Sequence, residues 1–85
     1  MSLADAAHAL EELAAGRTPS QSRAVRGLHA LDELVLKGHC ERALRDAAAT
    51  LELYVATGGV ISIFAGARAR AGVMAAAIRR AMDHG

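Results

Sequence analysis

The chain has 85 residues, a net charge of +1 and an apolar fraction of 53%, so its length suits one small domain. The charge is far below that of a dense basic surface, and one tyrosine and one phenylalanine offer little stacking area, so a nucleic-acid partner is not expected. Because 21 of the apolar residues are alanine, we expect a thin core and a tendency to associate.

The first predicted helix starts near Ser2, which together with Asp5 resembles a capping box, and Gly16 can end it. One apolar stripe at helical spacing comprises Leu3, Ala6, Leu10 and Leu13. Acidic residues at Asp5, Glu11 and Glu12 interrupt any long apolar run, so no targeting segment is expected here. We therefore expect a cytoplasmic protein.

The second predicted helix starts at "TPSQ", with Thr18 as N-cap, Pro19 at the first helical position and Gln21 reaching back to the cap. It runs to about Lys37. Its predicted apolar stripe comprises Val25, Leu28, Leu31 and Val35, with Leu34 alongside. Gly27 weakens the middle of this helix by about 1 kcal/mol relative to alanine, unless a neighbouring helix packs closely there.

The third predicted helix follows Gly38 and ends at the "TGG" of residues 57–59. Its apolar side comprises Cys40, Ala43, Leu44, Ala47, Leu51 and Val55. No segment alternates with period two between turn signals, although Val60 to Phe64 alone would suit a short strand. We predict a single all-α domain over residues 1–85, with four helices that form a small bundle or two αα-hairpins.

The fourth predicted helix, from about Val60 to Met82, is apolar or small on two opposite sides. One side has coiled-coil spacing and comprises Phe64, Ala67, Ala71, Met74, Ile78 and Ala81. The other side comprises Ser62, Ala65, Gly66, Ala69, Gly72, Val73, Ala76 and Arg80. An ordinary surface helix is charged where it faces water, so this second side needs an explanation.

Three explanations compete for this helix. Arg68 and Arg70 inside it disfavour a membrane span. It can instead be central in the monomer, with its alanines facing other helices or serving as helix-favouring residues towards water. In the third explanation small residues let another helix approach closely, which makes this side a subunit or partner interface. The predicted interface residues are Phe64, Ala65, Ala69, Gly72, Val73, Met74, Ala76 and Arg80.

Charge divides unequally along the chain. Residues 1–53 hold six basic and eight acidic residues, whereas residues 54–85 hold four basic and one acidic. The acidic first helix and the arginine-rich last helix are therefore predicted to attract each other, which would set an antiparallel pairing or steer a partner.

The segment "GHCERALRDAAATLEL", residues 38–53, resembles the second half of a tetratricopeptide repeat. Gly38 stands at the turn, Cys40 takes the place of the usual aromatic residue, and the matching positions that follow are Ala43, Leu44, Leu51 and Leu53. The resemblance implies a helix-hairpin scaffold that binds other proteins, as the small hairpin and repeat chaperones of bacterial secretion systems do.

The stretch "RGLHALDELVLKGHCERAL", residues 26–44, resembles the four-helix repressors that sense copper or formaldehyde, in which a cysteine opens the second helix. Cys40 is the matching residue and the candidate sensor thiol. Its nearest histidines, His29 and His39, are poorly spaced for one metal ion, and the later histidine and cysteine of those sensors are missing. No metal site and no cofactor are predicted.

No catalytic motif is found, and acidic pairs such as Asp32 with Glu33 are neighbours on a solvated face. We predict a non-enzymatic protein–protein interaction module, which acts as an adaptor, a chaperone or a structural subunit. It would work through self-association, most simply as a homodimer, or through partner binding by its last helix. The alternative is a helical transcriptional regulator with Cys40 as a metal or redox sensor.

Overall fold

The computed structural model describes residues 3–39, 41–58 and 65–83, and over residues 65–68 it describes the helix but not the side chains. The described residues form only helices, which confirms the predicted all-α, four-helix fold. These are α1 (Leu3–Ala14), α2 (Gln21–Leu36), α3 (Arg42–Ala56) and α4 (Ala65–Asp83). The predicted cap at Ser2 and the segment 60–64 lie outside the described residues.

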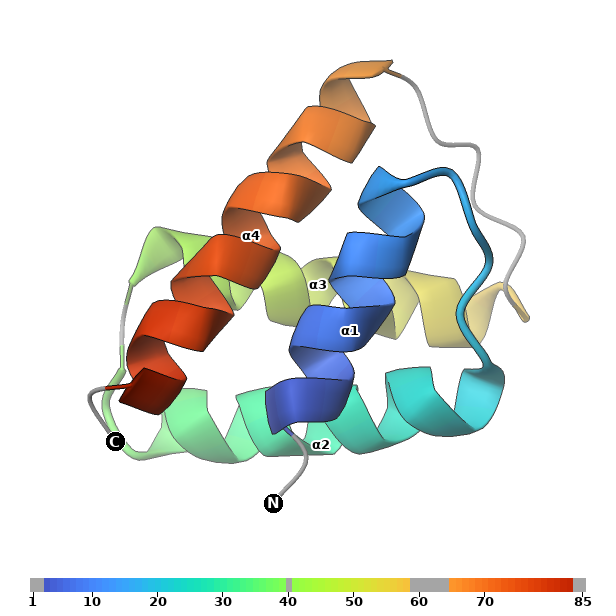
Figure 1. Ribbon diagram of the computed structural model, residues 1–85. Helices are drawn as coiled ribbons and strands as arrows, with labels where there is room; N and C mark the ends of the chain where they lie inside the picture. Colours follow the sequence, from blue (N-terminus) through green and yellow to red (C-terminus); the bar gives the residue numbers. More distant parts are fainter. Residues whose placement is uncertain (1–2, 40, 59–64, 84–85) are drawn as a thin grey trace.

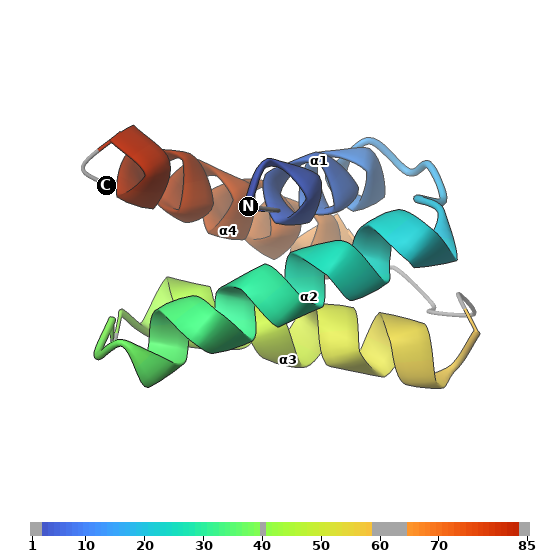
Figure 2. The same cartoon turned by 90° about the horizontal axis from the view of Figure 1, so that it is seen from below.

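The four helices form two layers that cross steeply (Figure 1). α1 and α4 lie side by side and antiparallel in one layer, and α2 and α3 form an antiparallel hairpin in the other (Figure 2). Within the described residues α1 and α3 each contact the other three helices, and the contacts of α1 with α2 and α4 are the most extensive. The predicted stripe of α1 is confirmed, since its four residues are all buried.

Small residues bring α1 and α2 into close contact. A Cβ atom built on Gly27 of α2 would lie 2.6 Å from the Cα atom of Ala6 in α1 and 2.7 Å from its amide nitrogen. A side chain of any size would collide with the backbone there. This contact is the close neighbour that the sequence required for a glycine in the middle of α2.

The α1–α2 contact also decides which side of α2 faces the core. The predicted stripe is right in part: Leu31 is fully buried and Leu28 and Leu34 pack against the core, whereas Val25 and Val35 are only partly buried. The buried side is formed by Ala24, Gly27, Ala30 and Leu31. The smallest residues of α2 face inward because α1 approaches closely there. The larger side chains of α2 therefore lie at the edges of the α1–α2 contact.

The predicted start of α2 is also wrong. Ser20 is the N-cap, and its Oγ atom accepts a hydrogen bond from the amide nitrogen of Arg23 at 3.2 Å. Pro19 lies before the helix and is buried. Its carbonyl oxygen accepts a hydrogen bond from the hydroxyl group of Tyr54 in α3. Pro19 therefore joins the α1–α2 connection to α3 rather than opening α2.

Glycines end α2 and α3 as the sequence predicted. Gly38 has a φ of +98° and Gly58 a φ of +69°, values that side chains disfavour. After α2, the amides of Gly38 and His39 donate to the carbonyl oxygens of Val35 and Leu34, respectively. These bonds satisfy the last carbonyl groups of the helix and turn the chain towards α3.

Half of the core is alanine, so the helices approach closely around few large side chains. Tyr54 is the largest fully buried side chain, and burial raises the pKa of its hydroxyl. In α3 the predicted stripe holds for Leu44, Ala47 and Leu51, which are buried. The core comprises Leu3, Ala6, Ala7, Ala9, Leu10, Leu13, Ala24, Ala30, Leu31, Leu44, Ala47, Leu51, Tyr54, Ala71, Met74, Ala75, Ala77 and Ile78.

Candidate interaction surface

The inner side of α4 packs against α1 and α3. Ala71, Met74 and Ile78 of the predicted apolar seam are buried, and Ala81 is half-buried. Met74, which the sequence also assigned to the interface, is only 6% exposed, so it belongs to this inner side. Phe64 lies outside the described residues, and the side chain of Ala67 is not described.

The opposite side of α4 faces solvent. Its described members, which we call the outer face of α4, are Ala69, Gly72, Val73, Ala76 and Arg80, all exposed. Val73 is 61% exposed, and a Cβ atom built on Gly72 would meet nothing within 4 Å. The alternative in which these alanines pack against other helices is therefore wrong for Ala69 and Ala76. The side chain of Ala65 is not described.

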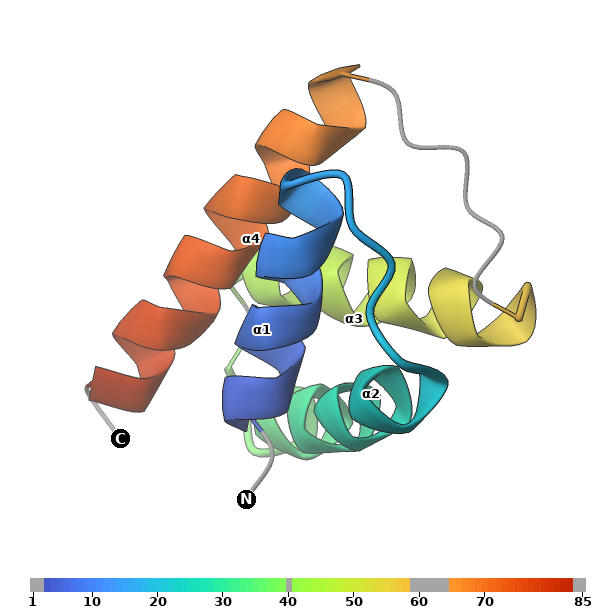
Figure 3. The same cartoon turned by 45° about the vertical axis from the view of Figure 1, so that its right-hand side comes forward.

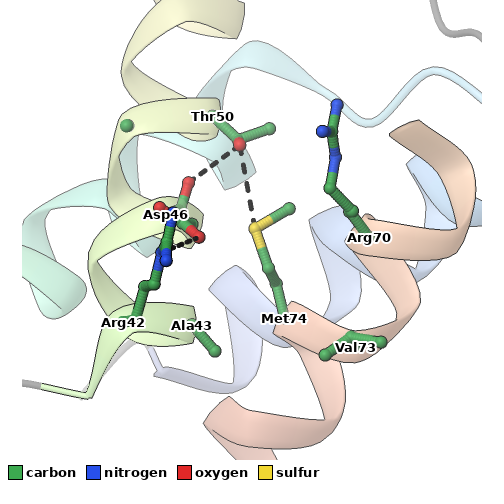
Figure 4. A pocket seen from close by; sticks show the side chains of 8 residues that line it. Arg42, Ala43, Asp46, Thr50, Arg70, Val73 and Met74 are labelled. Atoms are coloured by element: carbon green, nitrogen blue, oxygen red, sulfur yellow. Dashed lines mark hydrogen bonds and ion pairs between the residues drawn. The ribbon is translucent and has the colours of Figure 1, made fainter. Parts of the chain in front are cut away.

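A groove of about 670 Å³ separates the first half of α3 from the first half of α4 (Figure 4). Val73 belongs both to this groove and to the outer face of α4, so the two surfaces are continuous. The lining residues are Arg42, Ala43, Asp46, Ala49 and Thr50 of α3 and Arg70, Val73 and Met74 of α4.

The groove has an apolar floor, and its rim carries two arginines and one aspartate. Met74 extends towards Thr50, whose Oγ1 atom donates to the carbonyl oxygen of Asp46 at 2.8 Å and lies 3.8 Å from the Met74 Sδ atom. On the α3 wall, Arg42 Nε lies 4.0 Å from Asp46 Oδ2, and the Arg42 side chain is 95% exposed. Arg70 stands on the α4 wall and makes no ion pair with any described residue.

Leu53 is an exposed apolar residue of α3 that lies beyond the groove. It is 56% exposed and lies one turn beyond Ala49 and two turns beyond Asp46, on the same side of the helix. The exposed surface of α3 and α4 thus presents Leu53 and Val73 among small residues. The sequence did not reveal the α3 wall of the groove, because two charged residues four apart, such as Arg42 and Asp46, are typical of any solvent-exposed helix side.

The predicted attraction between the first and last helices occurs within one chain. Arg79 of α4 donates two hydrogen bonds, of 2.8 and 2.9 Å, to the carboxylate of Glu11 in α1. Hydrogen bonding from Arg79 lowers the pKa of Glu11, and the same pair raises the pKa of Arg79. Arg80 on the outer face lies 3.4 Å from Glu41, next to α3.

The remaining acidic residues of α1 are paired with α2. Asp5 lies 3.2 Å from Arg26, and Glu12 lies 3.1 Å from Arg23. Since Glu11 is paired with Arg79, the carboxylates of α1 are all engaged within the chain. They are not free to steer a partner, in contrast to Arg70.

Two other predictions concern Cys40 and the membrane. Cys40 lies outside the described residues, and no three of the described histidine and acidic residues come together in a way that would hold a metal ion. His29 and His39 are both exposed. None of the described helices combines the length and the apolar character that crossing a membrane requires.

Comparisons of the chain with protein-family models, with curated proteins and with solved structures gave no match. The case for a function therefore rests on the outer face of α4 and the groove beside it.

Proposed function

We propose that this chain is a small helical protein–protein interaction module that self-associates through the outer face of α4, most simply as a homodimer. The observation that carries the proposal is the exposure of a helix side that holds Ala69, Gly72, Val73 and Ala76. A helix side that remains in water is ordinarily charged. The charged residues of this side and its edge, Arg79, Arg80 and Asp83, all lie in the last two turns of the helix.

Small residues favour a close approach by a second helix. Helix axes pack about 8 to 10 Å apart, and alanine or glycine at the contact allows the shorter distances. The contact of Gly27 with Ala6 shows this packing inside the same chain. Val73, exposed at the edge of the groove, would gain about 1 kcal/mol or more from burial, whereas each alanine would gain less.

The biological role that fits such a surface is that of an adaptor, a chaperone or a structural subunit in the cytoplasm, without catalysis or a cofactor. The resemblance of residues 38–53 to half a tetratricopeptide repeat supports this class, because such hairpins are scaffolds for other proteins. The lack of any convergent set of polar groups in the groove beyond Arg42, Asp46, Thr50 and Arg70 also supports binding over chemistry.

The test is the double substitution Ala69→Glu with Ala76→Glu. Both side chains are exposed in the single chain, so the fold should survive, while two charges at the centre of the interface should dissociate the assembly. The matched control is Ala4→Glu with Ala15→Glu, which places the same charges at exposed alanines in and after α1. Light scattering coupled to size exclusion should show a monomer for the first variant and a dimer for the control. Equal mass for the two variants would refute the proposal.

A further inference from the structure

The end of α2 carries an exposed apolar side chain among carboxylates. Leu36 is 86% exposed, more than any other large apolar residue described. Asp32 and Glu33 precede it by four and three residues, so all three share one side of the helix, and both are exposed. We call these three residues the acidic end of α2.

The helix itself does not explain these carboxylates. Backbone carbonyl groups make the C-terminal end of a helix negative, so a carboxylate there costs on the order of 0.3 to 1 kcal/mol. The last turn of α2 itself holds no basic residue, and the nearest one is the C-cap residue Lys37. Within the described part of the chain, Asp32 and Glu33 form no ion pair.

The groove between α3 and α4 has the complementary chemistry. Arg42 and Arg70 stand on its opposite walls, and its floor is formed by Met74 with Val73 at the edge (Figure 4). Arg70 is without a counter-ion among the described residues, and Arg42 has only Asp46 at 4.0 Å. An occupant with one apolar side chain flanked by two carboxylates fits this arrangement.

We infer that the occupant of the groove is the acidic end of α2 from a second copy of this chain. Leu36 of the second copy lies against Val73 and Met74, and its two carboxylates face Arg42 and Arg70. This inference rests on the proposed self-association and adds a second contact beside it: α2 of one copy covers the groove of the other, next to the outer face of α4.

The positions of the two surfaces suit a closed dimer. The acidic end of α2 leads into the turn before α3, and the groove begins at the first turn of α3, so both lie towards the same end of the molecule (Figure 3). A twofold axis near that end can form the contact twice, once in each direction. A closed pair of this kind leaves neither groove free.

Two charge-reversed variants test the contact. The first, Asp32→Arg with Glu33→Arg, changes only the acidic end of α2, and the second, Arg42→Glu with Arg70→Glu, changes only the groove. Arginine near the end of α2 and glutamate in the first turn of α3 both favour their helices, so these changes should not unfold the chain. Circular dichroism of each variant checks the fold.

Each variant alone would oppose like charges, so we expect a dissociation constant raised at least tenfold in sedimentation velocity. An equimolar mixture should assemble again, because the unchanged groove of the first variant can bind the unchanged α2 end of the second, and the two reversed surfaces also attract. Added salt should weaken the wild-type dimer.

The outcomes separate this inference from the proposed function. If the charge-reversed variants remain as dimeric as the wild type, or if their mixture stays monomeric, the inference is wrong. The proposed function would still stand if Ala69→Glu with Ala76→Glu dissociated the wild-type dimer. A wild-type chain that is monomeric at about 200 µM would overturn both.

Discussion

Two glycines in the middle of helices have opposite surroundings in this molecule. Gly27 of α2 is buried, and the backbone of Ala6 leaves no room there for even one added carbon atom. Gly72 of α4 is exposed, and an added carbon atom would meet nothing within 4 Å. Each glycine weakens its helix by about the same amount, roughly 1 kcal/mol relative to alanine.

Small residues on a helix therefore indicate close packing only where a neighbouring helix is present. At Gly27 the neighbour is α1 of the same chain, and the weakened helix is offset by a tight contact. On the outer face of α4 the same residue types meet solvent in the single chain. The proposed second copy would give Gly72 and its neighbours the partner that Gly27 already has.

The largest change in stability is expected at the contact between Gly27 of α2 and Ala6 of α1. Gly27→Ala should lower the free energy of unfolding by about 2 kcal/mol, because the new methyl group forces α1 and α2 apart and this outweighs the gain in helix propensity. Urea unfolding measures the change. An unchanged or raised urea midpoint would show that α1 and α2 are farther apart than the 2.6 Å between a Cβ atom at Gly27 and the Cα atom of Ala6 implies.

A second prediction concerns the buried hydrogen bond between Tyr54 and Pro19. Tyr54→Phe should cost about 1 to 2 kcal/mol, because the buried carbonyl oxygen of Pro19 then loses the hydroxyl that donates to it. Thermal and urea unfolding of the variant measure this. A matched control is Leu53→Ala on the exposed side of α3, which should change the stability of the monomer by less.

At the exposed Gly72 the same kind of substitution should raise stability instead of lowering it. Gly72→Ala should raise the stability of the monomer by about 0.5 to 1 kcal/mol, since the helix gains propensity and nothing is displaced. The measurement belongs in the Ala69→Glu, Ala76→Glu background, where association does not contribute. Destabilisation there would mean that Gly72 has a close neighbour within the chain after all.

The smallest effect concerns the pair that holds α4 to α1. Because hydrogen bonding from Arg79 lowers the pKa of Glu11 below 4.5, this pair adds stability above that pH and loses it as the pH falls through the lowered pKa of the folded state. For an exposed pair the contribution is about 0.5 kcal/mol. Urea unfolding from pH 6 to pH 3 should show wild type and Glu11→Gln converging at the acidic end, and a constant difference would contradict the assignment.

Much of the fold could be predicted from the sequence because its signals are local. Apolar spacing in α1 and the glycines at 38 and 58 identified helices and their ends without any tertiary contact. The start of α2 could not be predicted from local signals, because Thr18 and Ser20 are equally good N-caps when considered alone. Tyr54 binds the carbonyl oxygen of Pro19, and this tertiary contact places Pro19 outside the helix.

The candidate site was predictable only on its α4 side. The outer face follows from helical spacing alone, and the structure exposes its described residues. The α3 wall of the groove depends on how α3 crosses α4, which no local pattern encodes. The exposure of Leu36 likewise depends on which side of α2 meets α1, and that choice is made by Gly27 and Ala6.

The proposed function requires that a second copy covers the outer face of α4. Sedimentation equilibrium of the wild-type chain between about 5 and 200 µM tests it most directly, because association depends on concentration by mass action. If the chain self-associates, its mass should rise towards twice 8.8 kDa. A mass that stays at 8.8 kDa over the whole range would contradict it.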